Sequence, residues 1–509
     1  MADIKREIER KFEFTPAGRK QQRPPQPPDL TGTGPIAAVR DRGTVRLDAV
    51  YYDTPDQRLA ADGLTLRRRT GGEDAGWHLK LPVAPGVRDE VRAPLADTVP
   101  RSLDALLRSR VRGAGLEPQV TLRSERQVSH LLDADGTLLA ELSRDQVRAE
   151  RGAAVAEWTE VEVELADDGD PALLDAVEKR FRKAGLRVSD APSKLARALA
   201  ETGAEPPPRP GPGPADGTAG AHVLAYLREQ LDALVAQDPA VRRDLPDSVH
   251  QMRVATRRLR SAFATYRRVL ERAATDPLRE ELRWLAAELG ADRDREVLFE
   301  RLRAGLAELP RGLRLGPVTS RLRTWNTTRR SSTRRRAVAA LDSARYLALL
   351  DALDALLADP PLRPAAARPA ARTLPKAVLR DWDRLADRVG TALALDPGED
   401  RDLALHEARK AAKRARYAAE AAAPALGNPA RRLARAAKGV QTLLGDHRDG
   451  VVARTALHGL AVQATDAGES AFSWGVLYAR EEALSARHEQ QLPDIWAQAS
   501  DPGLRASVK

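Results

Sequence analysis

The sequence predicts an α+β protein in which a β-rich N-terminal unit precedes an all-α unit. Up to about residue 200, segments of alternating apolar and polar residues are separated by turn signals, which is typical of antiparallel strands. The next segment, residues 201–217, is dense in Pro and Gly and lacks periodicity, so we interpret it as an exposed linker. From residue 218 on, long stretches rich in Ala, Leu and Arg predict helices.

The composition of the chain argues against disulfide-bonded, thiolate-metal and membrane-spanning proteins. A chain of 509 residues is long enough for two or more domains, and the lack of cysteine excludes disulfides and thiolate metal sites. There is no apolar run long enough to span a membrane and no signal-peptide pattern, so we expect a soluble cytoplasmic protein. Acidic and basic residues balance within residues 1–200, and the whole net charge of +10 therefore lies beyond them. The helical unit is the expected partner of a polyanion.

The first element, "EIERK", admits two structures. On a strand, Glu7, Glu9, Lys11 and Glu13 share one face, which is costly unless other charged groups lie among them. On a helix, Glu7 and Lys11 form an i,i+4 pair on a solvated surface.

The other elements of this unit follow in order, with a Pro-rich loop expected at residues 23–35. Period-two patterns predict strands, and longer amphipathic patterns predict helices between or after them. We therefore expect an antiparallel sheet or barrel with a few helices outside. The expected strands cover residues 44–54, 64–70, 76–82, 89–95, 137–150 and 158–165, and the expected helices cover residues 100–111 and 171–186.

The polar faces of these strands carry charges of one sign. Glu160, Glu162 and Glu164 alternate with valines in "WTEVEVEL", and Arg67 aligns with Arg69 in "LTLRRRT". Such faces usually point to water, but an ordinary exposed face mixes signs. The same parity aligns Glu141, Ser143 and Asp145 in one strand, and His78 and Lys80 in another. A barrel with these rows inward would hold Mg²⁺ or Mn²⁺ on its acids and a phosphate chain on its bases.

These residues resemble a known family. "EIERK" is similar to the ExExK signature of CYTH domains, also called triphosphate tunnel metalloenzymes, and "YYDT", "LRRR", "WHLKLP", "ELSRD", "EVEVEL" and "SKLARAL" follow the layout of that family. The resemblance covers about residues 3–200. It implies an eight-stranded antiparallel tunnel with flanking helices, which binds a triphosphate together with a divalent metal.

The resemblance also implies roles for individual residues. A metal-assisted attack of water on a terminal phosphoryl group is the implied reaction, and the organic substituent of the substrate stays open. Arg123 and Arg126 have opposite parity on a strand, so only one of them should face the lumen. The implied metal ligands are Glu7, Glu9, Glu160, Glu162 and Glu164. The implied catalytic set is Glu7, Glu9, Lys11, Asp145, Glu162 and Glu164. The implied substrate contacts are Lys11, Arg67, Arg69, Lys80, Lys194 and either Arg123 or Arg126.

The helical unit contains an internal repeat. "VHQMRVATRRLRSA" from Val249 matches "LHEARKAAKRARYA" from Leu405, and "LGADRDREV" from Leu289 matches "LGDHRDGVV" from Leu444. The two offsets, 156 and 155 residues, keep the same order and spacing. We therefore expect two structurally related helical halves.

Each half places a basic stripe on one helix face. A solvated face is the usual explanation of such a stripe, but residues 249–264 contain no acidic residue that could pair with the arginines. The recurrence of the pattern favours an external anion, and a histidine on the stripe could donate to phosphate. The stripes consist of His250, Arg253, Arg257 and Arg260, with Arg258 at the edge, and of His406, Arg409, Lys413 and Arg416, with Arg414 at the edge.

The stripes and their "LG…RD" companions resemble the CHAD domain over residues 218–505. That resemblance implies two pseudo-symmetric antiparallel helical bundles that bind inorganic polyphosphate along a basic groove. Asp294 and Asp449 match the acid of the motif and are expected to orient stripe residues. The first repeat has Asp292 where the second has His447, which predicts unequal halves.

The predicted function is a metal-dependent hydrolase of inorganic triphosphate or a related triphosphate, joined to a polyphosphate-binding domain. The alternative is a non-enzymatic polyphosphate-binding or scaffolding protein, and the two acid rows argue against it. Nucleic-acid binding is disfavoured because aromatic residues, which stack on bases, make up only 4% of the chain. Attachment to polyphosphate granules is expected if the helical unit recruits the chain.

Overall fold

The computed structural model describes residues 3–14, 26–204 and 215–508, apart from the side chains of 291–293 and 329–333. The expected linker and the expected Pro-rich loop lie partly outside the described residues, and so does the side chain of Asp292. The chain forms two compact units, residues 1–209 and 210–509, each with its own core. One unit contains the barrel and the other is helical.

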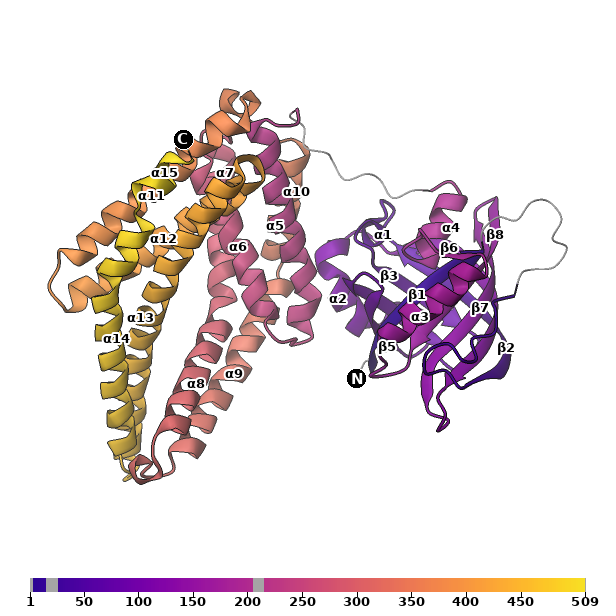
Figure 1. Cartoon of the computed structure of the whole chain (residues 1–509), viewed down its shortest axis with the longest axis horizontal. Helices are drawn as coiled ribbons and strands as arrows, with labels where there is room; N and C mark the ends of the chain where they lie inside the picture. Colours follow the sequence, from indigo (N-terminus) through magenta and orange to yellow (C-terminus); the bar gives the residue numbers. More distant parts are fainter. Residues whose placement is uncertain (1–2, 15–25, 205–214, 509) are drawn as a thin grey trace. The chain divides into compact units, whose positions relative to one another are not determined.

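The N-terminal unit is a closed antiparallel barrel of eight strands, as predicted (Figure 1). "EIERK" lies in a strand, since residues 3–8 of β1 pair with β5 and residues 9–13 pair with β8, and this double pairing closes the barrel. The strand order is β5-β4-β3-β2-β6-β7-β8-β1, and a short β9 extends β1. The strands are β1 (Asp3–Phe14), β2 (Ala38–Asp53), β3 (Thr65–Thr70), β4 (Gly76–Ala84), β5 (Val87–Ala93), β6 (Glu117–Leu132), β7 (Leu138–Arg151), β8 (Ala154–Leu165) and β9 (Leu186–Val188).

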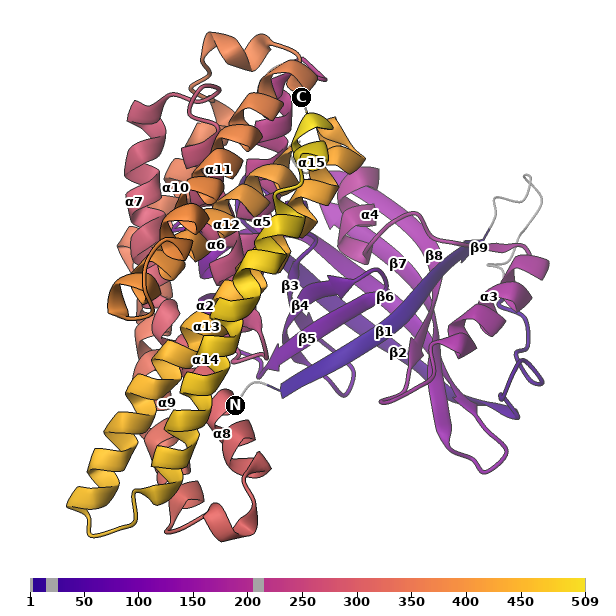
Figure 2. The same ribbon diagram turned by 60° about the vertical axis from the view of Figure 1, so that its left-hand side comes forward.

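The apolar face of the barrel points outward and is covered by helices. Val161 and Val163 of β8 pack with Phe12 under α3 (Ala172–Lys183), and Trp77 of β4 lies in the apolar cluster beside α2 (Arg101–Val111). Figure 2 shows α3 on the outer side of the strands. Because side chains alternate along a strand, covering the apolar face from outside leaves the charged rows inside.

A helix closes one end of the barrel interior. The apolar side of α4 (Lys194–Glu201), with Leu195 and Leu199, packs on inward-facing residues of four strands, among them Tyr51 and Trp158. Ser193 caps this helix, because its Oγ accepts a hydrogen bond from the backbone N–H of Ala196 at 3.0 Å. The helix therefore begins at the charged part of the interior. A single-turn helix, α1 (Arg58–Ala61), lies between β2 and β3.

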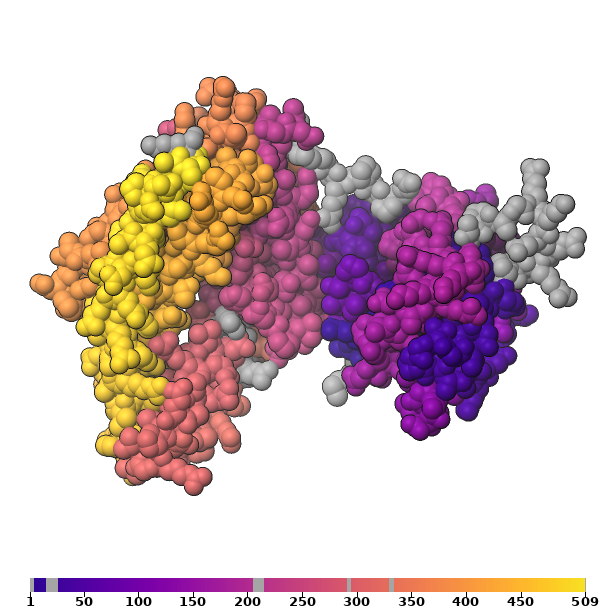
Figure 3. All heavy atoms as spheres, viewed as in Figure 1, coloured from indigo at the N-terminus to yellow at the C-terminus, as the bar shows by residue number. Residues whose placement is uncertain are grey.

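The C-terminal unit is entirely helical, as predicted, and its long helices α13 and α14 lie side by side (Figures 1 and 3). Among its described residues, we find no helix that combines the length and apolar character needed to cross a membrane. The helices are α5 (Ala219–Arg242), α6 (Ser248–Thr265), α7 (Arg272–Glu288), α8 (Gly290–Glu308), α9 (Val318–Asp342), α10 (Ala344–Ala358), α11 (Ala370–Leu393), α12 (Glu399–Leu426), α13 (Asn428–Asp466), α14 (Phe472–Ala499) and α15 (Pro502–Ala506), with 3-10 turns η1 (Arg311–Leu313) and η2 (Pro364–Ala367).

The repeated sequences occupy equivalent elements. The two basic stripes lie on α6 and α12, which contact each other. The two "LG" landmarks differ in structure: Leu289 marks the break between α7 and α8, whereas Leu444 lies inside the continuous α13. The starts of α5 and α11 also pair, since Ala219 N–H donates to the Arg368 carbonyl and Ala370 N–H donates to the Gly217 carbonyl. The halves are thus related but not identical.

Candidate functional site

The acidic rows form one wall of the barrel interior. In the register of the sheet, Asp145 of β7 lies opposite Glu160 of β8, and Glu162 lies opposite Lys11 of β1. Oxygens of Asp145, Glu160 and Glu162 lie within 4.8 Å of one another, and all three residues are buried. Glu164 continues the row opposite Glu9.

The basic rows form the facing wall on β3, β4 and β5. Arg67 and Arg69 point inward from β3, and Lys80 of β4 contacts Glu7 across the interior, with 2.6 Å between its Nζ and a carboxylate oxygen. Glu162 and Glu164 of the acidic wall and the residues of the basic wall line one cavity of about 210 Å³, which also receives Lys194 from α4. The barrel thus gathers acids and bases around a buried polar space.

Lysines neutralise the acidic wall. The Nζ of Lys194 lies 3.0 Å from Asp145, 2.5 Å from Glu160 and 2.6 Å from Glu162. Burial opposes the charged form of Lys194, but these carboxylates outweigh it and raise its pKa. Burial would also raise the pKa of Glu162, yet Lys11 and Lys194 hold that pKa well below its usual value. Lys194 and Glu162 are therefore both charged at neutral pH.

Glu7 differs from the other acids of β1. Burial raises its pKa, and nearby Glu90 and Glu164 add to the effect, although Lys80 opposes it. The pKa of Glu9 is lowered instead, because Lys11 and Lys80 outweigh the cost of burial. The pKa values of Glu7 and Glu9, two residues apart on one strand, are therefore shifted in opposite directions, so Glu7 binds a proton more readily than Glu9.

The structure distinguishes the two arginines of β6. Arg126 points into the interior and donates to both oxygens of Asp145, at 2.7 and 2.8 Å, and to Glu162 at 3.0 Å. Arg123 is more than half exposed on the outer face and pairs with Glu150 at 2.9 Å. The expectation of a substrate contact is therefore corrected for Arg123, which lies outside the cavity.

The two inward-facing arginines of β3, Arg67 and Arg69, have unused hydrogen-bonding capacity. The Nε atoms of Arg67 and Arg69 are buried and have no hydrogen-bond partner among the described residues. Burial, together with the positive charges of Arg67 and Arg126, lowers the pKa of Arg69 to about 9. An anion in the cavity would satisfy these donors and offset the repulsion between them.

One residue of the interior, Glu90 of β5, was missed by the sequence analysis. Glu90 is completely buried, accepts from Arg92 Nε at 2.5 Å, and lies 3.0 Å from the Nδ1 of His78. Burial lowers the pKa of His78 to about 4, so its imidazole is neutral at pH 7. The alternation of Arg88, Glu90 and Arg92 in "VRDEVRA" is the signal that could have identified this position.

The two basic stripes meet in the helical unit. We define the cationic cluster as the half-buried side chains of Arg253 and Arg257 on α6 and of Arg409 and Lys413 on α12. Burial lowers the pKa of Lys413 to about 7, and the charges of Arg409, Arg257 and Arg253 contribute to the shift. Arg257 and Lys413, which are 156 residues apart in sequence, therefore lie close enough for their positive charges to repel each other.

Some stripe residues have acidic partners outside residues 249–264, which themselves contain no acid. Arg253 donates to Asp294 at 2.9 Å, so Asp294 orients the stripe as expected. Glu420 of α12 accepts from Arg258 at 3.1 Å and from Arg416 at 2.8 Å.

Other members of the cationic cluster have no such partner. Arg257 and Lys413 form no hydrogen bond or ion pair in the described part of the chain, and the Nε atoms of Arg257 and Arg409 are buried without a hydrogen-bond partner. The charge of Asp449 on α13 acts on Lys413 and Arg409 but does not outweigh burial and the neighbouring arginines. Half-buried cations without a direct carboxylate contact are costly, so these residues favour an external anion.

The remaining stripe residues flank the cationic cluster. His250 and His406 are half-buried on α6 and α12. Burial lowers the pKa of His406 to about 4, so this histidine is neutral at pH 7. Arg260 lies near Arg279 of α7, and burial followed by that repulsion lowers its pKa.

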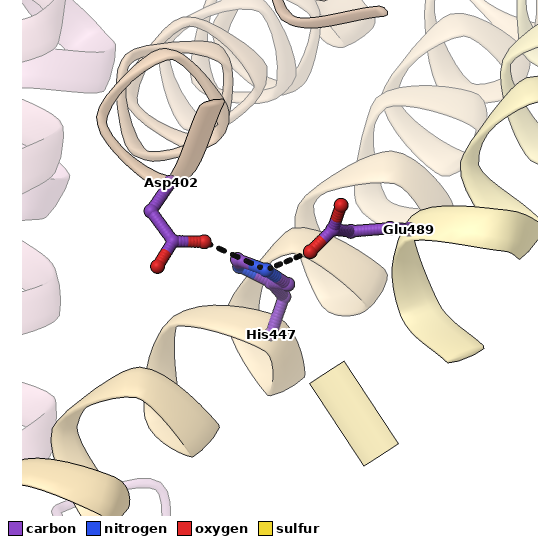
Figure 4. A group of neighbouring side chains, drawn as sticks. All are labelled: Asp402, His447 and Glu489. Carbon is purple, nitrogen blue, oxygen red and sulfur yellow. Dashed lines mark hydrogen bonds and ion pairs between the residues drawn. The ribbon is translucent and has the colours of Figure 1, made fainter. Parts of the chain in front are cut away.

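His447 belongs to a separate group that holds three helices together. Figure 4 shows it between Asp402 of α12 and Glu489 of α14, with 3.3 and 3.2 Å from its Nε2 to their oxygens. The second oxygen of Glu489 is paired with Arg401 at 3.1 Å, and that of Asp402 with Arg454 at 3.4 Å. Because arginines already neutralise the charge of both acids, we interpret this group as a structural clamp, that is, a set of contacts that holds α12, α13 and α14 together.

Replacing His447 by Ala should destabilise the helical unit. The change leaves two partly buried carboxylates facing each other without the imidazole, at a cost of about 1–3 kcal/mol. Thermal unfolding followed by circular dichroism at 222 nm should show a lower Tm for His447→Ala than for His458→Ala, an exposed histidine of the same helix. Equal Tm values for the two variants would contradict the clamp.

Comparisons with known proteins agree with this architecture. The sequence profile of the CYTH domain matches residues 5–199, and that of the CHAD domain matches residues 225–458. The uncharacterized protein Rv2226 of Mycobacterium tuberculosis is 39% identical over 511 residues, which cover 96% of this chain and 94% of the relative.

Two solved structures are similar to parts of this chain. PptA from Streptomyces chartreusis is 26% identical, with a TM-score of 0.46, over 55% of this chain and 99% of that protein. The CHAD domain from the plant Ricinus communis is 26% identical, with a TM-score of 0.40, over 59% of this chain and 96% of that domain. From the matched profiles and the full-length relative, we conclude that this chain belongs to the family of proteins in which a CYTH domain is followed by a CHAD domain.

Proposed function

We propose that the barrel is a metal-dependent hydrolase of inorganic triphosphate or a related triphosphate, and that the helical unit binds polyphosphate. The observation that carries the first part is the meeting of an acidic wall and a basic wall around one buried cavity. Phosphate chains suit such a space, because their oxygens accept contacts from both metal ions and arginines.

The acidic wall fits a divalent cation. Its donors are carboxylate oxygens only, which Mg²⁺ and Mn²⁺ prefer. Glu162 and Glu164, together with Glu7 and Glu9 on the paired strand β1, line the cavity and would hold the cation. The Nζ of Lys194 already lies against Asp145, Glu160 and Glu162. A bound cation would neutralise phosphate charge and lower the pKa of a water molecule.

The basic wall would bind and orient the phosphate chain. Arg67, Arg69 and Lys80 would contact its oxygens, and the substrate would satisfy the buried Nε–H groups of Arg67 and Arg69. In the proposed reaction, a water oxygen bonds to the terminal phosphorus while the bond to the leaving pyrophosphate breaks. The fixed positive charges stabilise the negative charge that develops on the leaving group.

The test is phosphate release from tripolyphosphate by the full chain, with Mg²⁺ and then with Mn²⁺. We expect turnover that depends on the metal and stops when EDTA is added. A full chain that releases no phosphate but binds long-chain polyphosphate would instead support a scaffolding protein.

The proposed polyphosphate site is the cationic cluster. It carries several half-buried cations on two helices, and two of them, Arg257 and Lys413, have no carboxylate partner in the described part of the chain. A linear polyanion provides repeated charges that match a site formed by basic stripes on two helices in contact. Binding there would hold the barrel close to polyphosphate granules.

The affinity for polyphosphate should fall as pH rises from 6 to 9. Lys413 has a pKa of about 7 in the free protein, so it is charged below pH 7 and mostly neutral above it. A bound anion raises that pKa, so binding at high pH requires proton uptake. If the anion raises this pKa by one unit, the affinity drops by about tenfold over this range.

The measurement is the Kd of long-chain polyphosphate across this pH range, because its internal phosphates stay ionised throughout. Lys413→Arg should flatten the profile, since Arg stays charged. A profile with the same slope in both proteins would assign the titration to another group.

A further inference from the structure

A second basic cavity lies in the helical unit, at the C-terminal end of α6 and the N-terminal half of α11. Its volume is about 410 Å³, which is within the range of small-molecule sites. The described residues that line it include no acidic side chain. The basic residues that line it are Arg268, Arg368, Arg372, Lys376 and Arg380.

Most of these basic side chains form no ion pair with a described residue that would stabilise the fold. In the described part of the chain, Arg268, Arg368, Arg372 and Lys376 form no side-chain ion pair. Arg372, Lys376 and Arg380 follow one another at i,i+4 spacing along α11, so their charges destabilise the helix modestly. Only Arg380 has a structural contact, a donation to the Thr265 carbonyl at the end of α6, and its Nε is buried without a partner.

Asp381, the acidic residue next to Arg380 in sequence, does not neutralise the positive charge of the cavity. Asp381 follows Arg380 on α11, but it is fully buried and does not line the cavity. Its oxygens contact Arg414 at 2.9 Å and the Thr265 hydroxyl at 2.5 Å. The charge of the cavity therefore remains positive.

The basic residues of α11 that line the cavity have no basic counterparts in the first half of the helical unit. Thr218 pairs with Pro369, which aligns the start of α5 with the start of α11. With this alignment, the counterparts of Arg372, Lys376 and Arg380 on α5 are Ala221, Ala225 and Glu229. Only the second half of the unit has these cations.

The cavity is also separate from the cationic cluster. The residues that line it come from the last residue of α6, from residues 266–269 that follow it, from residues 365–369 and from α11, and none comes from α12. Arg414 of α12 does not line the cavity, and it donates to the Ala264 carbonyl at 2.9 Å.

We propose that this cavity is a second anion site, which binds a compact anion carrying several phosphate groups independently of the cationic cluster. Its four unpaired cations supply charge-assisted hydrogen bonds to phosphate oxygens. The concave shape suits a short phosphate chain, either free or as the tail of a nucleotide.

The lack of native cysteine allows a local test. In the full chain, Ala371→Cys places a single exposed thiol next to Arg372, and an environment-sensitive fluorophore on it reports occupancy of this cavity. Tripolyphosphate and ATP are titrated separately, with NaCl matched for ionic strength. We expect a saturable response to at least one anion that NaCl does not reproduce, and the tighter ligand identifies the source of the phosphates.

Charge variants make the test specific. Arg372→Gln combined with Lys376→Gln should weaken the response at least tenfold. Arg431→Gln combined with Arg435→Gln, exposed residues of α13, should not change it, and Lys413→Gln in the cationic cluster should not change it either. A response that follows ionic strength alone, or one lost equally with Lys413→Gln, would overturn the proposal.

Discussion

Glu162→Gln is expected to lower tripolyphosphate hydrolysis by about 100-fold or more. The carboxylate of Glu162 contacts Lys11 at 2.9 Å, Lys194 at 2.6 Å and Arg126 at 3.0 Å, and it belongs to the group of acids that would hold the metal. The amide keeps the size of the side chain but removes its charge, which weakens the metal site and leaves buried cations without their counter-charge.

The rate should be measured over a range of Mg²⁺ concentrations, since a weakened metal ligand shifts the metal dependence as well as the maximal rate. Glu157→Gln is the matched control, because Glu157 lies on the same strand but on the outer face, paired with Arg148. Circular dichroism should establish that both variants are folded. A folded Glu162→Gln protein with the rate of Glu157→Gln would refute the proposed role of the acidic wall.

The second large effect is expected in polyphosphate binding. Arg257→Gln combined with Lys413→Gln should weaken the binding of long-chain polyphosphate by about 100-fold or more, because each removes a charge-assisted contact of about 1.5–3 kcal/mol. Neither residue pairs with a carboxylate in the described part of the chain, so the change should leave the fold intact. The loss should appear in the Kd measured by calorimetry at fixed salt.

Two controls separate specific binding from general attraction. Arg431→Gln combined with Arg435→Gln removes the same charge from the exposed surface of α13 and should change the Kd little. Duplex DNA should compete poorly with polyphosphate. Equal losses in the two double variants, or equal competition by DNA, would show that net charge alone determines binding.

Local patterns predicted most of the strands and the duplication. The alternation of Glu160, Glu162 and Glu164 with valines placed the acids on one face, and the structure has that face inside. The strand β6 gave no such signal, because its outward residues, such as Arg123 and Glu125, are charged rather than apolar. A strand that lacks an apolar face does not show the alternation by which strands are recognised.

Other features depended on contacts between distant segments. "EIERK" fits a helix or a strand, since both place Glu7 and Lys11 on one face, and only pairing with β5 and β8 decided between them. The parity of Arg123 and Arg126 was evident, but the choice between them required the register in which Arg126 lies opposite Asp145.

The sequence by itself determined which residues share a strand face or a helix face, and that the helical unit is duplicated, because these properties follow from local periodicity and repeated motifs. Only the tertiary structure decided which faces meet. The acidic wall reaches the basic wall because β1 pairs with β5 and closes the barrel, and Lys413 comes under the charge of Arg257 because α12 packs on α6. Such contacts join segments far apart in the chain, and no local pattern encodes their register.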